Sequence, residues 1–109
     1  MRKFDLYVGC NVNGQPEYDR EYVRLVVEQA LENAGFDGAT FTEAVGLWKG
    51  VSELTVICSI CTDRERADVF EVAGVVKEHL HQESVMVIES EPRIEFICGG
   101  KYGLSRSSG

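Results

Sequence analysis

Two cysteines at motif spacing come closest in this sequence to a chemical signature. The segment "ICSIC" places Cys58 and Cys61 as in a redox pair or half of a zinc site. A redox thiol needs a helix N-terminus to become reactive. The surrounding "LTVICSIC" instead has the pattern of a strand, on which positions three apart point to opposite faces. Because no second CxxC or CxxH completes a zinc site, we expect no metal. In a cytoplasmic chain the default is reduced thiols, and we expect this of all four cysteines, Cys10 and Cys98 included.

The histidines and carboxylates form no catalytic pattern either. His79 and His81 end an expected helix two positions apart, so their side chains diverge by roughly 200° and cannot bind one metal ion. Asp5 and Glu53 could meet across neighbouring strands, but nothing around them marks an acid–base pair. The segments "NVNGQ" and "CGGKYG" do not join a strand to a helix with the spacing of a phosphate loop. We predict no catalytic residue and no cofactor.

The single tryptophan has the strongest claim to contact a ligand. Trp48 lies in "AVGLWKGVSEL", residues 44–54, between glycines and directly before Lys49. An indole can stack on a planar ring and the neighbouring ammonium can pair with an anion, which suits a nucleotide-like ligand. Packing at the end of a sheet and contact with another subunit are the alternatives for Trp48.

The hydrophobic periodicity predicts the elements that position these residues. Alternation indicates strands, and apolar residues every three or four positions indicate helices. Strands are expected over 3–12, 39–48, 51–60 and 84–89, with helices over 17–34 and from 62 to about 80. This β-α-β-β-α-β order predicts an α+β, ferredoxin-like sandwich with two helices on one face of a four-stranded antiparallel sheet. Residues 93–98 could add an edge strand. Residues 1–98 form the domain, and the Gly- and Ser-rich 99–109 a flexible tail.

The two periods also assign side chains to faces. The expected core residues from the strands are Phe4, Leu6, Val8, Cys10, Phe41, Val45, Leu47, Leu54, Val56, Cys58 and Ile60. The expected helical stripes are Val23, Val26, Val27, Ala30, Leu31 and Ala34, then Ala67, Phe70, Ala73, Val76 and Leu80. Two helices cover only one face of the sheet. We therefore expect Tyr7, Asn11 and Trp48 on the open face, where they can reach a ligand or a second subunit.

Composition excludes several classes of protein. The chain has 109 residues, 44% of them hydrophobic and 27% charged, as in a globular domain. The net charge of −7, with scattered Lys and Arg, disfavours nucleic acid as a partner. No apolar run is long enough to span a membrane, and "MRKFDLYV" lacks the features of a secretory signal. These features predict a cytoplasmic protein.

Three segments carry a resemblance to a known family. "LYVG" at 6–9, "FDGATFTEAVGLWKG" at 36–50 and "HQESVMV" at 81–87 occur in the order and at the separations of a bacterial and phage family of unknown function. The chain resembles its short leaderless versions over residues 5–97. The resemblance implies a small ferredoxin-like protein, often an oligomer, with no established enzymatic activity. The positions that match the family pattern are Tyr7, Gly9, Gly38, Gly46, Trp48, Gln82 and Glu83.

Three functional hypotheses follow. The first is a non-enzymatic, homo-oligomeric module that holds a small nucleotide-like ligand, as in phage anti-defence proteins that sequester messengers. Its predicted ligand-binding residues are Tyr7, Asn11, Trp48, Lys49, Gln82 and Glu83. The second is an inhibitor or adaptor that grips a host protein through the open sheet face or the acidic helices. The third is a small ferredoxin-like enzyme of the monooxygenase or isomerase kind, for which Glu53, His79 and His81 are the candidate bases.

Overall fold

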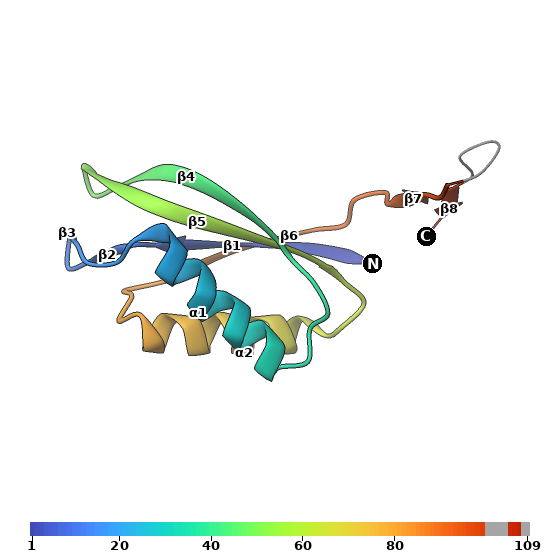
Figure 1. Cartoon of the computed structure of the whole chain (residues 1–109), viewed down its shortest axis with the longest axis horizontal. Coiled ribbons are helices and arrows are strands. Elements are labelled where there is room, and N and C mark those ends of the chain that lie inside the picture. Colours follow the sequence, from blue (N-terminus) through green and yellow to red (C-terminus); the bar gives the residue numbers. More distant parts are fainter. Residues whose placement is uncertain (100–104, 108–109) are drawn as a thin grey trace.

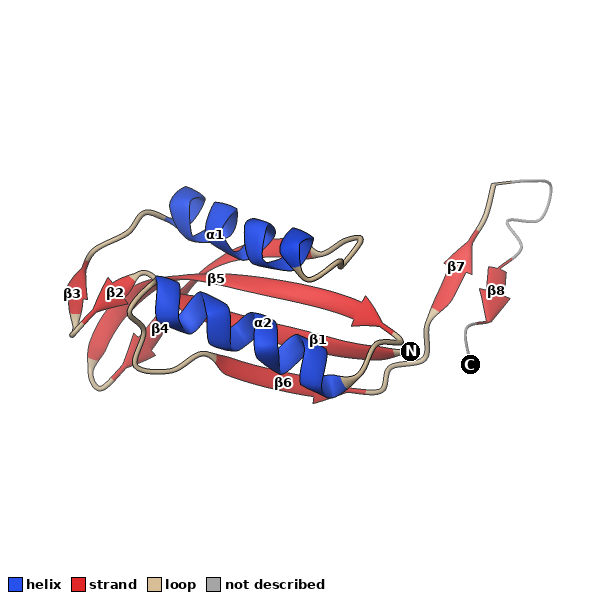
Figure 2. Cartoon of the chain, turned by 90° about the horizontal axis from the view of Figure 1, so that it is seen from below, coloured by secondary structure: helices blue, strands red, loops and turns tan. Residues whose placement is uncertain are grey.

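The computed structural model describes residues 1–99 and 105–107 and is built on a four-stranded antiparallel sheet. The strands are β1 (Arg2–Gly9), β4 (Thr40–Trp48), β5 (Val51–Thr62) and β6 (Met86–Ser90), in the order β4-β5-β1-β6. Helices α1 (Arg20–Asn33) and α2 (Arg66–His79) lie together on one face, and the opposite face is left open (Figures 1 and 2). This small α+β arrangement fits the ferredoxin-like pattern.

Local signals set the limits of the helices. The Asp19 carboxylate accepts a hydrogen bond from the Tyr22 N–H at 2.7 Å and caps α1. Gly35, with a φ of 80°, follows the last turn of α1 in the left-handed conformation that favours glycine. Helix α2 ends in a similar way with His81 in that conformation, at a φ of 52°. The N–H groups of His81 and Gln82 bond back to the carbonyls of Glu78 and Lys77, which fixes the direction in which the chain leaves α2.

The core lies between the helices and the covered face of the sheet. Phe4, Leu6 and Val8 alternate along β1 and are fully buried, which confirms the predicted period of this strand. The α1 stripe is also confirmed, because Val23, Val27, Ala30 and Leu31 are buried and Val26 and Ala34 pack against them. Each fully buried Val, Leu or Phe side chain contributes about 1.5–3 kcal/mol relative to exposure. This layer therefore anchors β1 and β5, from which the open face is presented.

Five predicted core positions are wrong. Val45, Leu47 and Leu54 have the parity of the covered face, but they are 68%, 74% and 43% exposed. Hairpin β4–β5 extends beyond the helices (Figure 1), so neither helix covers its tip. Ala67 and Phe70 of α2 are also exposed, Phe70 by 49%, since the buried stripe of this helix consists of Val69, Val72, Ala73 and Val76.

The connections add short strands that the sequence pattern did not predict. β2 (Asn11–Val12) and β3 (Gln15–Pro16) form a hairpin through Asn13 and Gly14, both at positive φ, as a tight primed turn requires. β7 (Glu95–Ile97) pairs with β8 (Ser105–Ser107) and not with the main sheet, so the predicted extra edge strand is wrong. This pair extends away from the body (Figure 1). Of the predicted tail, residues 99–109, only Gly99 and β8 are described, and the other residues lie outside the described part of the chain.

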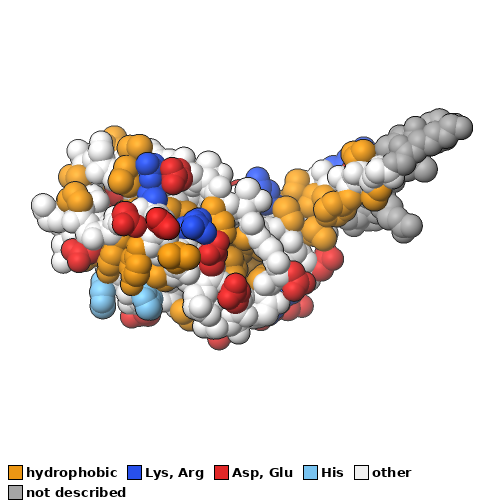
Figure 3. All heavy atoms as spheres, viewed as in Figure 1, with side chains coloured by type: hydrophobic (Ala, Val, Ile, Leu, Met, Phe, Trp, Pro, Cys, Tyr) orange, Lys and Arg blue, Asp and Glu red, His pale blue; other side chains and the backbone are white. Residues whose placement is uncertain are grey.

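Hydrophobic side chains are also exposed on the β7–β8 arm and on the open face of the sheet. Phe96 and Ile97 of β7 are exposed where this arm leaves the body (Figure 3). On the open face of the sheet, Met86 and Ile88 are also exposed. Neither helix in the described part of the chain is long and apolar enough to cross a membrane.

Candidate functional site

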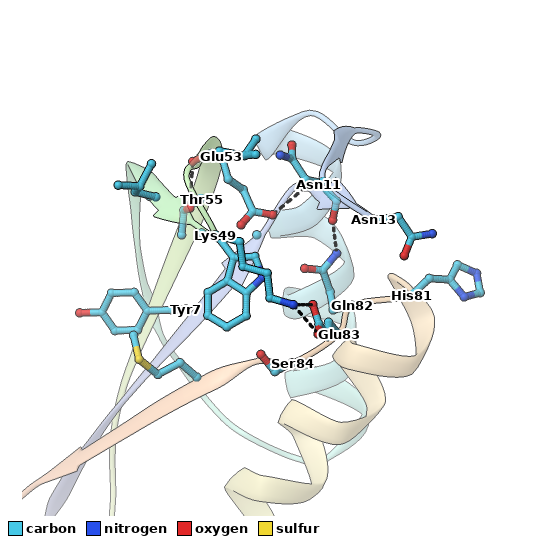
Figure 4. Close-up of a pocket in the computed structure, with 17 residues that line it drawn as sticks. Tyr7, Asn11, Asn13, Lys49, Glu53, Thr55, His81, Gln82, Glu83 and Ser84 are labelled. Atoms are coloured by element: carbon cyan, nitrogen blue, oxygen red, sulfur yellow. Dashed lines mark hydrogen bonds and ion pairs between the residues drawn. The ribbon is translucent and has the colours of Figure 1, made fainter.

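A cavity of about 790 Å³ lies on the open face, at the end of the sheet where three connections meet. Its floor is formed by β1, β4 and β5, and its rim by the β2–β3 turn, the β4–β5 turn and the segment between α2 and β6 (Figure 4). The structure brings together in its lining all the residues that were predicted to bind a ligand: Tyr7, Asn11, Trp48, Lys49, Gln82 and Glu83. Trp48 is on the open face, as predicted, in register with Val51. Ligand binding by these residues stays a prediction.

Unusual backbone conformations gather at this cavity. Among the described residues, the non-glycine residues with positive φ are Asn13, Lys49 and His81, and all three line it. Each lies on a different rim connection. Left-handed backbone is costly for residues with a Cβ and tends to persist at functional sites. The sequence analysis did not identify Asn13 as a site residue, and the signal that could have found it is the Asn13–Gly14 dipeptide of a tight turn.

The Glu53 carboxylate is held directly above strand β1. Its Oε2 accepts a hydrogen bond from the Asn11 backbone N–H at 2.9 Å. A Cβ on Gly9 would lie 2.2 Å from that same oxygen, so the carboxylate occupies the space of a missing side chain. The mid-strand glycine was the sequence signal for such a close approach. Glu53 was considered only as a candidate base; the structure makes it an anchored anion in the cavity.

Gln82 connects the segment after α2 to the backbone of Asn11, the residue that also binds Glu53. Its side-chain amide donates to the Asn11 carbonyl at 2.9 Å and to the Leu80 carbonyl at 3.2 Å. The Asn11 carbonyl thus accepts a hydrogen bond from Gln82, and the Asn11 N–H donates one to Glu53 (Figure 4). This side chain is therefore bonded to backbone groups and ties two rim segments together.

Lys49 and Glu83 form an ion pair in the lining of the cavity. The Lys49 ammonium lies 3.1 Å and 3.4 Å from the two oxygens of Glu83, and 5.7 Å from the centre of the Trp48 ring. The hydrogen bond from Lys49 and its charge, together with a hydrogen bond from Trp48, lower the pKa of Glu83. Both charged side chains are about two-thirds exposed, at 67% and 68%. The pair therefore lines the cavity at a place that is open to solvent.

The other candidate bases and the cysteines lie outside the centre of the cavity. His81 is at the rim and its ring points away from the neighbouring residues (Figure 4), while His79 lies 3.4 Å from the Tyr22 hydroxyl. Burial raises the pKa of Cys10 to about 11 and that of Cys58 to about 12, with nearby carboxylates adding to both shifts, so these thiols stay protonated near neutral pH. Cys61 is exposed, which confirms that the two motif cysteines face opposite ways. Across the described residues, no group of three or more His, Cys, Asp or Glu is placed to hold a metal ion.

The arrangement favours a cationic ligand with an aromatic group. Glu53 and Glu83 contribute two negative charges and Lys49 one positive charge, so these three groups leave a net negative charge in the cavity. Tyr7 and Trp48 supply aromatic surface beside it. A volume of about 790 Å³ is within the range of sites for small molecules and cofactors. Fold and site together define a small α+β protein with an anionic, aromatic cavity at one end of an open sheet.

Two solved structures that share this architecture are of a phage enzyme. One is described as a phage SAM lyase in the apo state; it is 24% identical, with a TM-score of 0.69, over 82% of this chain and 78% of that one. Another is a phage SAM lyase in complex with S-methyl-5′-thioadenosine; it is 25% identical, with a TM-score of 0.72, over 83% and 80% of the two chains. No family model matches this chain, and no curated protein matches it. The family resemblance noted above therefore stays a prediction.

These neighbours correct the leading functional hypothesis. They are enzymes, so the prediction of a non-enzymatic binding module is wrong. The expectation of a nucleotide-like ligand agrees in part, because one of these enzymes holds a small nucleoside, S-methyl-5′-thioadenosine. Of the three hypotheses, the enzyme is now favoured, although a lyase is neither of the two reaction kinds expected for it.

Proposed function

We propose that this chain is a ferredoxin-like lyase that cleaves S-adenosylmethionine (SAM) in the cavity at the open end of its sheet. The observation that carries the proposal is the likeness, over 83% of the chain, to a phage SAM lyase holding S-methyl-5′-thioadenosine. The cavity supports it independently. SAM combines a purine, which suits Trp48 and Tyr7, with a sulfonium cation, which suits the net negative charge from Glu53 and Glu83.

The products follow from the bonds of the substrate. The sulfonium of SAM carries a methyl group, the adenosyl C5′ and the Cγ of an aminobutyrate chain. A lyase that leaves S-methyl-5′-thioadenosine keeps the first two bonds and breaks the third. The electrons of the S–Cγ bond stay on sulfur, which becomes a neutral thioether.

Attack by the substrate's own carboxylate is the route that this cavity supports best. One carboxylate oxygen forms a bond to Cγ as the S–Cγ bond breaks, giving homoserine lactone and S-methyl-5′-thioadenosine with no proton gained or lost. The alternative, elimination, requires a base to remove a proton from the unactivated Cβ. The intramolecular attack requires only that the chain be held folded, and such positioning can supply several kcal/mol of the barrier (about 7–11 at most).

In this route Glu53 acts through its charge and its fixed position. The hydrogen bond from the Asn11 N–H at 2.9 Å and the absence of a side chain on Gly9 hold the carboxylate in place before the substrate arrives. A preorganised anion can orient the sulfonium without the cost of reorganisation. Because positive charge on sulfur decreases as the bond breaks, Glu53 contributes to binding and orientation more than to the chemical step.

Incubation of the protein with SAM tests the proposal. Chromatography with mass detection should show S-methyl-5′-thioadenosine and homoserine lactone forming in equal amounts. In H₂¹⁸O, homoserine derived from the lactone carries the label only in its carboxyl group, whereas direct hydrolysis of SAM labels the side-chain hydroxyl. Unchanged SAM, together with no binding of S-methyl-5′-thioadenosine, would refute the proposal.

The finer predictions from the sequence remain to be tested in the same protein. Self-association is compatible with the exposed apolar residues of the open face, Met86 and Ile88 among them. A cytoplasmic location and an anti-defence role are compatible with an enzyme that consumes SAM. All three stay predictions.

A further inference from the structure

The Lys49–Glu83 pair has features that a purely structural ion pair does not need. Its partners come from different connections, the β4–β5 turn and the segment after α2, and meet at 3.1 Å in the lining of the cavity. Lys49 is held there in a left-handed backbone conformation, at a φ of 50°. Both side chains are about two-thirds exposed, and exposed ion pairs contribute little to stability because water screens them. Breaking the Lys49–Glu83 ion pair therefore costs little free energy.

The charges of the pair are complementary to one end of an amino acid. An α-carboxylate and an α-ammonium lie on the same carbon atom and present opposite charges about 3 Å apart, a separation close to that of the Lys49 and Glu83 head groups. Replacing one ion pair by two new pairs leaves no charge without a partner. Glu53 offers no such pairing, because it is an anion held by a backbone N–H.

We infer that Lys49 and Glu83 form the subsite for the amino-acid end of the substrate, opening their mutual pair to receive its α-carboxylate and α-ammonium groups. This inference rests on the proposed function. A carboxylate has two oxygens, so Lys49 can hold one while the other attacks Cγ. Once the lactone has formed, the carboxylate charge is gone and Lys49 returns to Glu83. S-methyl-5′-thioadenosine has neither an α-carboxylate nor an α-ammonium group, so this subsite does not bind that product.

Calorimetric titration with two stable ligands separates this subsite from the rest of the cavity. S-adenosylhomocysteine carries the zwitterionic end but a neutral thioether, so it is not cleaved by this route. S-methyl-5′-thioadenosine carries the same adenosine without the zwitterion. The variants are Lys49→Met and Glu83→Gln. Lys77→Met is the matched control, since Lys77 is a partly exposed lysine of α2 that does not line this cavity.

Each cavity variant should weaken S-adenosylhomocysteine about tenfold, the size of one charge-assisted hydrogen bond in a partly exposed site. Binding of S-methyl-5′-thioadenosine should change less than twofold, and the control variant should change neither. With SAM as substrate, KM should rise in the two cavity variants. Equal losses for both ligands would overturn the inference by assigning the pair to the adenosine or to the fold, and no loss for either would place the zwitterion elsewhere. If the unmodified protein binds neither ligand, the proposed function itself fails.

Discussion

Replacing Gly9 by alanine should reduce the cleavage of SAM, because the new methyl group would push the Glu53 carboxylate out of its position. The new Cβ would lie 2.2 Å from Glu53 Oε2 and 2.4 Å from its carboxyl carbon, whereas ordinary contacts begin at 3.4 Å. The carboxylate must therefore withdraw by more than 1 Å. In doing so it loses the geometry of its hydrogen bond to the Asn11 N–H. The substitution displaces the Glu53 carboxylate but does not remove its negative charge. It therefore tests the position of this charge alone.

The size of the effect follows from the distance. A sulfonium held about 4 Å from Glu53 gains about 4 kcal/mol at an effective dielectric constant of about 20, and at about 5 Å the gain falls to about 3.3 kcal/mol. A loss of about 0.7–1 kcal/mol lowers kcat/KM by about three- to fivefold, with most of it in KM. Removal of the charge in Glu53→Gln forfeits the whole interaction, so its loss should reach 10²- to 10³-fold, roughly.

The assay is the rate at which S-methyl-5′-thioadenosine forms from SAM at several substrate concentrations. Gly38→Ala is the control, because a Cβ there has nothing within 4 Å. Circular dichroism and thermal melting verify that each variant is folded. If folded Gly9→Ala keeps full activity, or if Glu53→Gln loses no more than Gly9→Ala, the carboxylate does not act in the way argued here.

Three further predictions concern the thiols, acid stability and the open face. Near pH 8 a thiol reagent should modify Cys61 and Cys98 in the native protein but not Cys10 and Cys58, because burial raises the pKa of these two thiols to about 11 and 12. Rapid modification of all four cysteines before unfolding would contradict the burial of Cys10 and Cys58. The ion pairs with Lys49 and Arg66 lower the pKa of Glu83 and Glu89 below the usual 4.5, so their stabilisation is present above that pH and is lost as the pH falls through the lowered values. Acid titration of the melting temperature, compared with the double variant Glu83→Gln/Glu89→Gln, should show a smaller decrease below pH 4.5 in the variant; identical curves would contradict this. Finally, if the open face associates with another copy, Ile88→Lys should lower the sedimenting mass, whereas Lys77→Met should not; a mass unchanged by Ile88→Lys would argue against association through that part of the face.

The sequence was most informative where a repeating pattern and a covered face coincide. Alternation along β1 predicted Phe4, Leu6 and Val8 as core, and the pattern of α1 predicted its buried stripe. Alternation reports only which face a residue shares and not whether anything covers that face. Val45 and Leu47 have the correct parity but lie beyond the ends of the helices, and no local pattern encodes where a helix on the other side of the core stops.

The candidate site was predicted in part for a related reason. Tyr7 and Trp48 follow from strand parity, which held to the end of the sheet. The contributions of Asn13 and His81 depend on left-handed backbone at the ends of connections, and an asparagine or a histidine in that conformation is much harder to recognise from sequence than a glycine. Glu53 was visible as a carboxylate facing outward. Its anchoring depends on Gly9 and Asn11, which are more than forty positions away in the chain.

The lack of a catalytic motif in the sequence is compatible with the proposed lyase for a chemical reason. Sequence motifs report groups that must be prepared for chemistry, such as a nucleophile beside a base or a set of metal ligands. In the reaction proposed here the nucleophile and the leaving group both belong to the substrate, and no proton moves. The protein then has to hold a flexible chain in a ring-closing shape, and an anchored anion, an aromatic surface and an ion pair that opens are sufficient for that task. Such groups are common on any protein surface. A sequence without a catalytic signature is therefore weak evidence against catalysis wherever the substrate can react with itself.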